Sequence, residues 1–203
     1  MRKKQAFTLA EILISLTVIA VLSAILIGSL SGVQPDRPKI MFKKAYQITE
    51  RVVGELVNDE TIYPYDEDNF GFYNTDAASV DGTNTSFEGA TKFCNFFARK
   101  LNVITDIPAN GFTQSPCVFQ TSDSISWIVP SDFTANNGQV TITVDINGSA
   151  EHDGKNPNSN DDNNPDRDVY NIIVHYDGRV SVPIGGRENE YLRSHSSTRN
   201  NNN

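Results

Sequence analysis

Residues 7–30 read FTLAEILISLTVIAVLSAILIGSL, and this stretch decides the fold that the chain can adopt. From Ile12 to Leu30 it contains 19 residues without a charge. As a helix, such a run spans about 28 Å, which matches the hydrocarbon core of a bilayer at roughly 30 Å. A core helix of a soluble domain rarely lacks charge over this length. The sequence therefore predicts a membrane-spanning helix over residues 7–31.

The distribution of charge indicates how this helix is oriented. Arg2, Lys3 and Lys4 precede it, whereas the whole 203-residue chain has a formal net charge of -8. Basic residues favour the cytoplasmic side of a membrane, so we expect a cytoplasmic N-terminus and an acidic remainder outside. The acidic balance argues against nucleic-acid binding, which needs Lys and Arg to neutralise phosphates. The 38% hydrophobic residues suffice for a modest core and exclude global disorder.

One carboxylate, that of Glu11, lies within the apolar run that begins at Phe7. Burial of a carboxylate in lipid costs several kcal/mol, which makes Glu11 a candidate functional residue. An ordinary signal anchor leaves this residue unexplained. A removable secretory signal does so too, and its cleavage site would need small residues where Leu22 precedes Ser23 and Ala24.

The N-terminal sequence MRKKQAFTLAE, followed at once by an apolar helix, resembles the prepilin family. This family comprises the type IV pilins and the pseudopilins of type II secretion systems. Its motif is a short basic leader, a Gly, Phe-Thr-Leu-x-Glu and a long apolar run, and here Ala6 stands in place of that Gly. The resemblance implies a leader of residues 1–6, cleavage between Ala6 and Phe7 by the prepilin peptidase, and N-methylation of Phe7.

The resemblance also implies a role for Glu11 and a set of partners. In the family, the matching carboxylate pairs with the free N-terminal amine of a neighbouring subunit. The alternative is a protonated Glu11 that packs near the membrane interface without a specific role. Further implications are insertion in the inner membrane, a periplasmic head, an inner-membrane assembly platform, and sibling subunits in a periplasmic or extracellular filament. We therefore predict a structural subunit of a type IV pilus or a type II secretion pseudopilus. The alternative is a monomeric, membrane-anchored periplasmic binding protein with an acidic head.

Residues 32–187 are predicted to form the amphipathic helix and the globular head of an α+β, pilin-like fold. Two prolines within residues 32–38 interrupt the helical chain. Apolar residues then recur at helical spacing over residues 39–59. We expect this second helix to pack on the head through a stripe of eight residues: Ile40, Met41, Ala45, Ile48, Val52, Val53, Leu56 and Val57.

The remaining elements of the head follow from shorter patterns. Residues 60–90 are expected to be a surface loop with a few anchoring aromatics, with an aromatic-acidic ligand-binding loop as the alternative. Residues 91–101 predict a short helix with Phe93, Phe96, Phe97 and Leu101 facing inward. Alternating β-branched residues predict a small antiparallel sheet from residues 125–129, 140–146, 169–176 and 179–182. Residues 188–203 are expected to be a disordered tail.

Cys94 and Cys117 are the only cysteines. If the head faces an oxidising compartment, pairing is favoured. We therefore predict a structural disulfide between them. Two buried free thiols or a redox pair are the alternatives, although no CxxC arrangement is present.

An Asx-rich loop separates the last two long strands, with six Asp and six Asn between residues 145 and 168. Ca²⁺ takes six to eight oxygen ligands, and the resemblance adds that major pseudopilins carry a calcium site in a C-terminal loop. The alternative is a solvated turn region without metal. No HExxH, GxSxG, P-loop or GxGxxG motif is present, so we predict no enzymatic activity. The candidate calcium ligands are Asp145, Asn147, Asp161, Asp166 and Asp168.

Overall fold

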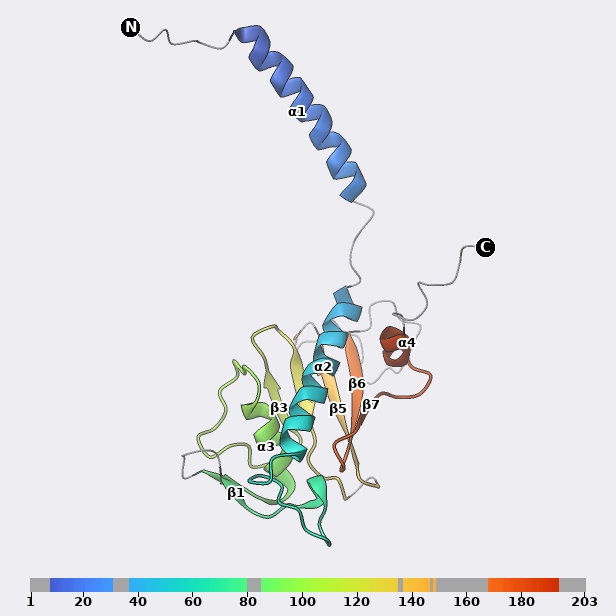
Figure 1. Cartoon of the computed structure of the whole chain (residues 1–203). Coiled ribbons are helices and arrows are strands. Elements are labelled where there is room, and N and C mark those ends of the chain that lie inside the picture. Colours follow the sequence, from blue (N-terminus) through green and yellow to red (C-terminus); the bar gives the residue numbers. More distant parts are fainter. Residues whose placement is uncertain are drawn as a thin grey trace, which may run out of the picture. The chain divides into compact units, whose positions relative to one another are not determined.

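The computed structural model describes residues 8–30, 37–79, 85–134, 137–146, 148 and 168–193 (Figure 1). The chain divides into two compact units, Met1–Arg37 and Pro38–Asn203. We call the second unit the head. The first unit contains α1 (Leu9–Leu30), a helix of 22 residues that corresponds to the helix predicted over residues 7–31. Within the described ranges, no helix combines the length and the apolar character that a membrane crossing needs.

The head is built on a five-stranded antiparallel sheet of order β3-β4-β5-β6-β7, so that strands adjacent in sequence are also adjacent in the sheet. Along β5, Val140, Ile142 and Val144 are buried, whereas Thr141 between them is exposed. This period of two gives the sheet one buried face. The four predicted strands are confirmed, and β3 is an additional one. The strands are β3 (Cys117–Gln120), β4 (Ser126–Val129), β5 (Gln139–Asp145), β6 (Val169–His175) and β7 (Val180–Ser181).

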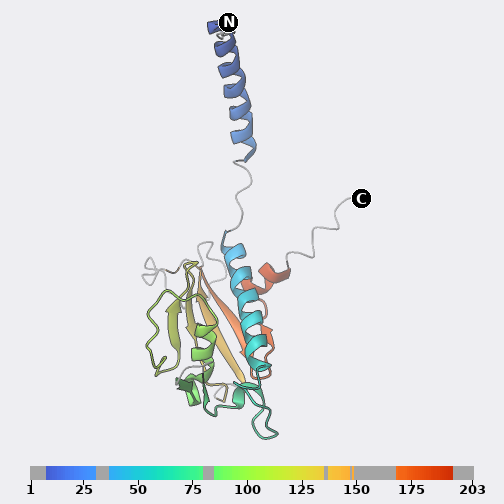
Figure 2. The same cartoon turned by 60° about the vertical axis from the view of Figure 1, so that its left-hand side comes forward.

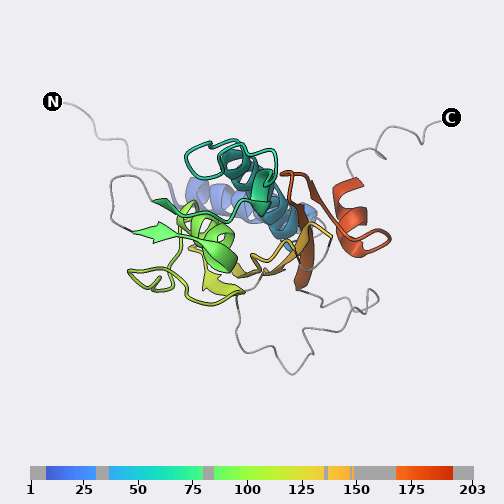
Figure 3. The same ribbon diagram turned by 90° about the horizontal axis from the view of Figure 1, so that it is seen from below.

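Two helices of the head cover the buried face of the sheet (Figures 2 and 3). They are α2 (Arg37–Val57) and α3 (Lys92–Arg99), which confirm both helices predicted for this part of the chain. Pro38 lies in the first turn of α2, where the missing N–H of proline costs no helical hydrogen bond. Shorter elements complete the head: η1 (Gly71–Tyr73), β1 (Ala78–Ser79), β2 (Ser86–Phe87), η2 (Gly89–Thr91) and α4 (Arg187–Arg193).

A cross-strand row of large side chains forms the centre of the core. Trp127 on β4 pairs with Val144 on β5, and Val144 pairs with Tyr170 on β6. The ring of Phe97 on α3 lies 5.7 Å from that of Trp127, and the ring of Phe42 on α2 lies 5.0 Å from that of Tyr170. Both helices therefore dock on the same row, which explains why they share one face of the sheet.

The inward face of α2 differs from the predicted stripe at Ile40, which is exposed, and at Phe42 and Thr49, which are buried. Ile40 was expected to face inward but is 54% exposed, whereas Phe42 is fully buried. Residues two apart on a helix point about 200° away from each other, so only one of these two can contact the sheet. Phe42 takes the buried position because Tyr170 and Tyr191 both pack against its ring. The buried residues of α2 are Phe42, Ala45, Thr49, Val52, Val53 and Leu56.

The C-terminal segment begins with a helix where a disordered tail was expected from residue 188 onward. In α4, Glu188 is buried and accepts a hydrogen bond from the backbone N–H of Asn171 on β6 (3.1 Å). The ring of Tyr191 packs against Phe42 and Tyr170 at 6.2 and 5.8 Å. These tertiary contacts, rather than local propensity, stabilise so short a helix. Residues 194–203 lie outside the described part of the chain.

The opposite edge of the sheet is covered by residues 102–105. The N–H of Ile104 donates to the carbonyl of Gln120 on β3 (2.9 Å), and the N–H of Gln120 donates to the hydroxyl of Thr105 (2.8 Å). Val103 forms a bridge with Thr121, just beyond the end of β3. The N–H and the carbonyl of Gln120 on the outer side of β3 therefore have partners within the head.

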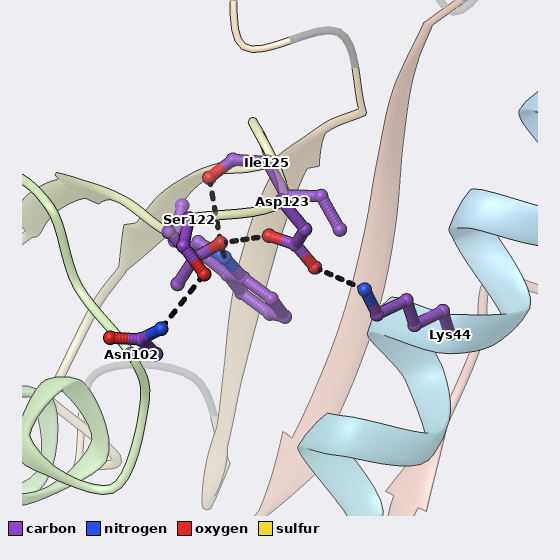
Figure 4. A network of polar contacts seen from close by, with 7 residues as sticks. Lys44, Asn102, Ser122, Asp123 and Ile125 are labelled. Carbon is purple, nitrogen blue, oxygen red and sulfur yellow. Dashed lines mark hydrogen bonds and ion pairs between the residues drawn. The ribbon is translucent and has the colours of Figure 1, made fainter.

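A polar network attaches the turn between β3 and β4 to α2 (Figure 4). Lys44 on α2 forms an ion pair with Asp123 (2.8 Å), and the Thr121 hydroxyl donates to the same carboxylate (2.6 Å). The indole N–H of Trp127 donates to the Thr121 oxygen at 3.0 Å. Partial burial of Asp123 would raise its pKa, but the hydrogen bonds from Lys44 and Thr121 outweigh burial and lower it. The network links the helix, the turn and the core tryptophan.

A charged side chain lies inside the aromatic core beneath α3. Lys92 is 1% exposed, and its ammonium donates to the backbone carbonyl of Asn74 (3.0 Å) and lies 4.3 Å from the centroid of the Tyr63 ring. Burial lowers the pKa of Lys92 to about 8, although the nearby carboxylate of Asp76 opposes the shift. Burial likewise raises the pKa of Tyr63. The folded head therefore binds the Lys92 proton more weakly than the unfolded chain does.

The free energy of unfolding of the head is expected to rise between about pH 8 and pH 10. In this window the folded state releases the Lys92 proton, whereas the unfolded chain retains it up to the ordinary pKa of 10.5. More protons bound in the unfolded state make stability increase with pH. Above pH 10 the unfolded Tyr63 ionises while the buried one does not, which reverses the slope. Urea unfolding across this range measures the effect, and a rise that persists in Lys92→Met would contradict it.

Candidate processing and assembly site

The N-terminus of α1 is closed by a reciprocal pair of side-chain contacts between Thr8 and Glu11. The Glu11 carboxylate accepts the backbone N–H of Thr8 (2.9 Å) and its hydroxyl (3.1 Å). In return, the Thr8 oxygen accepts the backbone N–H of Glu11 (3.3 Å). This is a capping box, in which two backbone donors of the first helical turn receive acceptors. The carboxylate also lies where the helix dipole favours negative charge.

The rest of α1 presents apolar side chains in every direction. All side chains described from Thr8 to Ile25 are exposed, including Ile14 at 63% and Ile19 at 60%. The hydroxyl of Ser15 donates to the carbonyl of Glu11 and that of Thr17 to the carbonyl of Ile14, both at 2.8 Å. These two polar groups therefore need no water. A helix that is apolar all round is normally buried in lipid or among other helices.

Of the three residues predicted for processing and assembly, the structure describes only Glu11. Ala6 and Phe7 lie outside the described residues, so the cleavage position stays a prediction. Glu11 lies in the first turn of α1, and its contact with Thr8 was not among the predictions. The spacing Thr-x-x-Glu before an apolar run is the usual sequence signature of a capping box, so this partner was detectable.

The predicted disulfide is confirmed between Cys94 on α3 and Cys117 at the start of β3. Their Cα atoms are 5.9 Å apart, within the range that a disulfide spans. Both residues are buried, and the N–H of Cys94 donates to the Ser131 hydroxyl (2.8 Å). The bond joins the helix to the edge strand, across a separation of 23 residues.

The candidate calcium ligands are described only in part. Asn147, Asp161 and Asp166 lie outside the described residues. Asp145 ends β5, and its carboxylate accepts the N–H of Gly148 (3.2 Å); the carbonyl of Asp168 accepts the N–H of Ile146 (3.0 Å). The two aspartates thus lie at neighbouring strands at one end of the sheet. In the described ranges, no group of three His, Cys, Asp or Glu residues could hold a metal ion.

Comparison with known proteins adds evidence for the N-terminal segment. Residues 1–27 match the family model for the prokaryotic N-terminal methylation motif. The chain carries a prepilin-type N-terminus. This motif is typical of type IV pilins and type II pseudopilins, and it implies processing by a prepilin peptidase. No curated protein and no solved structure matches the chain.

The layout of the head agrees with the fold that was predicted alongside the prepilin-type motif. The motif covers the leader and most of α1, whereas the head shows the α+β layout of pilins, with a helix, an antiparallel sheet and shorter helices. Proteins with this motif are usually structural rather than enzymatic. They are anchored in the inner membrane before assembly.

Proposed function

We propose that the protein is a structural subunit of a filament, either a type IV pilus or a type II secretion pseudopilus. It is inserted in the inner membrane with its N-terminus in the cytoplasm and its head in the periplasm. The prepilin peptidase removes residues 1–6, and an assembly platform then moves the mature chain into a filament with sibling subunits. The α1 helices pack together in the core of that filament.

The observation that carries this proposal is the exposed, apolar α1, most of which lies within the methylation motif matched by residues 1–27. Such a helix needs an apolar environment both before and after assembly, and the bilayer and a bundle of sibling helices supply it in turn. The internal hydrogen bonds of Ser15 and Thr17 suit both environments, because neither leaves an unsatisfied hydroxyl. A monomeric membrane anchor would need the apolar helix but neither the cleavage motif nor Glu11.

The mature protein is expected to begin at Phe7 with a methylated amine. Intact-mass measurement and N-terminal analysis of protein from its native membrane test this directly. Ala6→Gly, which restores the residue usual in the family, should be processed at least as completely as the wild type, and a bulky Ala6→Leu should block cleavage. An intact Met1 on the native protein would favour the monomeric anchor instead.

We further propose that the Asx-rich loop binds Ca²⁺ through Asp145, Asn147, Asp161, Asp166 and Asp168. Hard oxygen ligands of this kind suit calcium, which would relieve repulsion among the carboxylates. Binding to the folded head alone adds about 2.7 kcal/mol at a hundredfold excess over Kd. The head should therefore melt at a higher temperature in calcium than in chelator, and Asp145→Ala should abolish the difference. Equal melting temperatures at matched ionic strength would leave the loop as a solvated connector.

A further inference from the structure

An aromatic surface lies at the end of the head where α2 stops. Tyr65 is 72% and Phe70 is 45% exposed, and their rings make an edge contact at 6.1 Å. Phe70 contacts Tyr176 at 6.2 Å, and Tyr176 stacks on Tyr73 at 4.5 Å. Four rings from two distant parts of the chain thus form one continuous row, which we call the aromatic row. Large exposed aromatics are uncommon on a free surface and common in binding sites.

The aromatic row is held in place by the backbone beneath it. The N–H of Phe72 donates to the carbonyl of Tyr176 (2.9 Å), and the N–H of Tyr176 donates to the carbonyl of Gly138 (2.8 Å). Gly138 has a φ of +80°, and a Cβ on it would lie 2.6 Å from the ring of Tyr176 and 2.6 Å from the hydroxyl of Tyr73, so glycine is required here. The rings of Tyr73 and Tyr176 are therefore positioned before any partner arrives, which reduces the entropy cost of binding.

Three carboxylates accompany the exposed end of the aromatic row. Asp66, Glu67 and Asp68 occupy the loop between Tyr65 and Phe70, and the Asp66 carboxylate accepts the N–H of Asp68 (3.0 Å). Residues 52–91 contain nine acidic residues and neither Lys nor Arg. On the adjoining β6–β7 hairpin, Arg179 is engaged by Asp177 in an ion pair of 2.6 Å. The ligand that fits both the rings and the charge is a cation.

We propose that the aromatic row and the carboxylates of residues 66–68 bind a cationic polypeptide segment. Guanidinium and ammonium groups stack on the faces of Tyr and Phe while pairing with neighbouring carboxylates. The anionic phosphates of nucleic acids and acidic lipids would be repelled by the same surface. The assignment does not rest on filament formation, since a monomeric head presents the same residues.

Fluorescence anisotropy with a labelled hexa-arginine peptide tests the proposal on the full-length protein in detergent. Tyr65→Ala leaves the charge unchanged, so its effect isolates the ring. Both this variant and the triple variant Asp66→Asn, Glu67→Gln, Asp68→Asn are expected to weaken binding about tenfold, the loss of roughly 1–2 kcal/mol in contact energy. Ile184→Ala and Asp106→Asn are matched controls, because both residues are exposed and lie outside the aromatic row and its carboxylates.

Each outcome decides between a specific site and a general charge effect. Unchanged binding by Tyr65→Ala, or equal losses in the control variants, would overturn the proposal in favour of diffuse electrostatic attraction. Binding of a neutral cello-oligosaccharide that depends on Tyr65 would overturn the cationic assignment and indicate a sugar-binding platform. Tyr65 and residues 67 and 68 are exposed, so the variants should keep the melting temperature of the wild type.

Discussion

Glu11→Ala is expected to abolish incorporation of the chain into filaments while leaving its insertion in the membrane intact. If the carboxylate pairs with the amine of a neighbouring Phe7 in an apolar core, its removal leaves that amine unpaired. Such a loss costs roughly 3–5 kcal/mol, or about a hundredfold or more in association. Insertion should not suffer, because a more apolar helix partitions into lipid more readily. The ratio of the variant in sheared filaments to that in membranes measures the effect.

Two variants of the capping box separate the effect of the Glu11 charge from its role in capping α1. Glu11→Gln retains a side-chain oxygen for Thr8 but has no charge. Thr8→Ala retains the charge and removes the hydroxyl. If pairing with the neighbouring amine is the role of Glu11, the Gln variant fails to assemble and Thr8→Ala assembles. The opposite result would show that Glu11 serves the local helix start and would end the pairing hypothesis.

Removal of the disulfide by Cys94→Ala and Cys117→Ala is expected to lower the free energy of unfolding of the head by about 3 kcal/mol. The bond closes a loop between α3 and β3, and the unfolded chain gains freedom when it is absent. For a domain of this size the melting temperature should fall by roughly 6–12 °C. Alanine is preferable to serine, because both sites are buried and a serine hydroxyl introduced there would lack a hydrogen-bond partner.

The wild type in reducing agent is the matched control for this variant. Its melting temperature should approach that of the double alanine variant, and reducing agent should not change the variant itself. Labelling of the unreduced, denatured native protein with a thiol reagent gives an independent test. Reaction at both Cys94 and Cys117 would show that the bond is absent in the native protein.

Periodicity in the sequence was sufficient to predict most of the fold. The long uncharged run of residues indicated α1. Apolar residues at helical spacing indicated α2 and α3, and alternating β-branched residues indicated β4 to β7. β3 was not predicted because its apolar pair, Val118 and Phe119, is too short to reveal a period. The residues of α4 are mostly polar, and its helix depends on contacts of Glu188 and Tyr191 with distant strands. Tertiary contacts of this kind leave no local signal.

The candidate sites were predictable to a different degree. The motif identified Glu11, and the cysteine count identified the disulfide. By contrast, nothing in the local sequence distinguishes Lys92 from an exposed lysine, yet α3 is buried from Lys92 to Ala98. The ion pair of Lys44 with Asp123 and the aromatic row each join residues more than 75 positions apart. No spacing rule connects residues at such separations.

Contacts to the backbone of Gln120 on the edge strand β3, and of Asn171 on β6 beyond the short β7, restrict how copies of this chain can join at these two positions. An exposed edge strand can accept a strand from another molecule, which leads to strand exchange or to cross-β aggregates. Here residues 102–105 occupy the outer side of β3 at Gln120, and Glu188 takes the backbone N–H of Asn171 on β6. Strand addition at these two positions would first have to displace these segments. Polymers of this protein should therefore yield fibre diffraction without a dominant 4.7–4.8 Å inter-strand reflection, and they should dissociate into folded subunits rather than into unfolded chains.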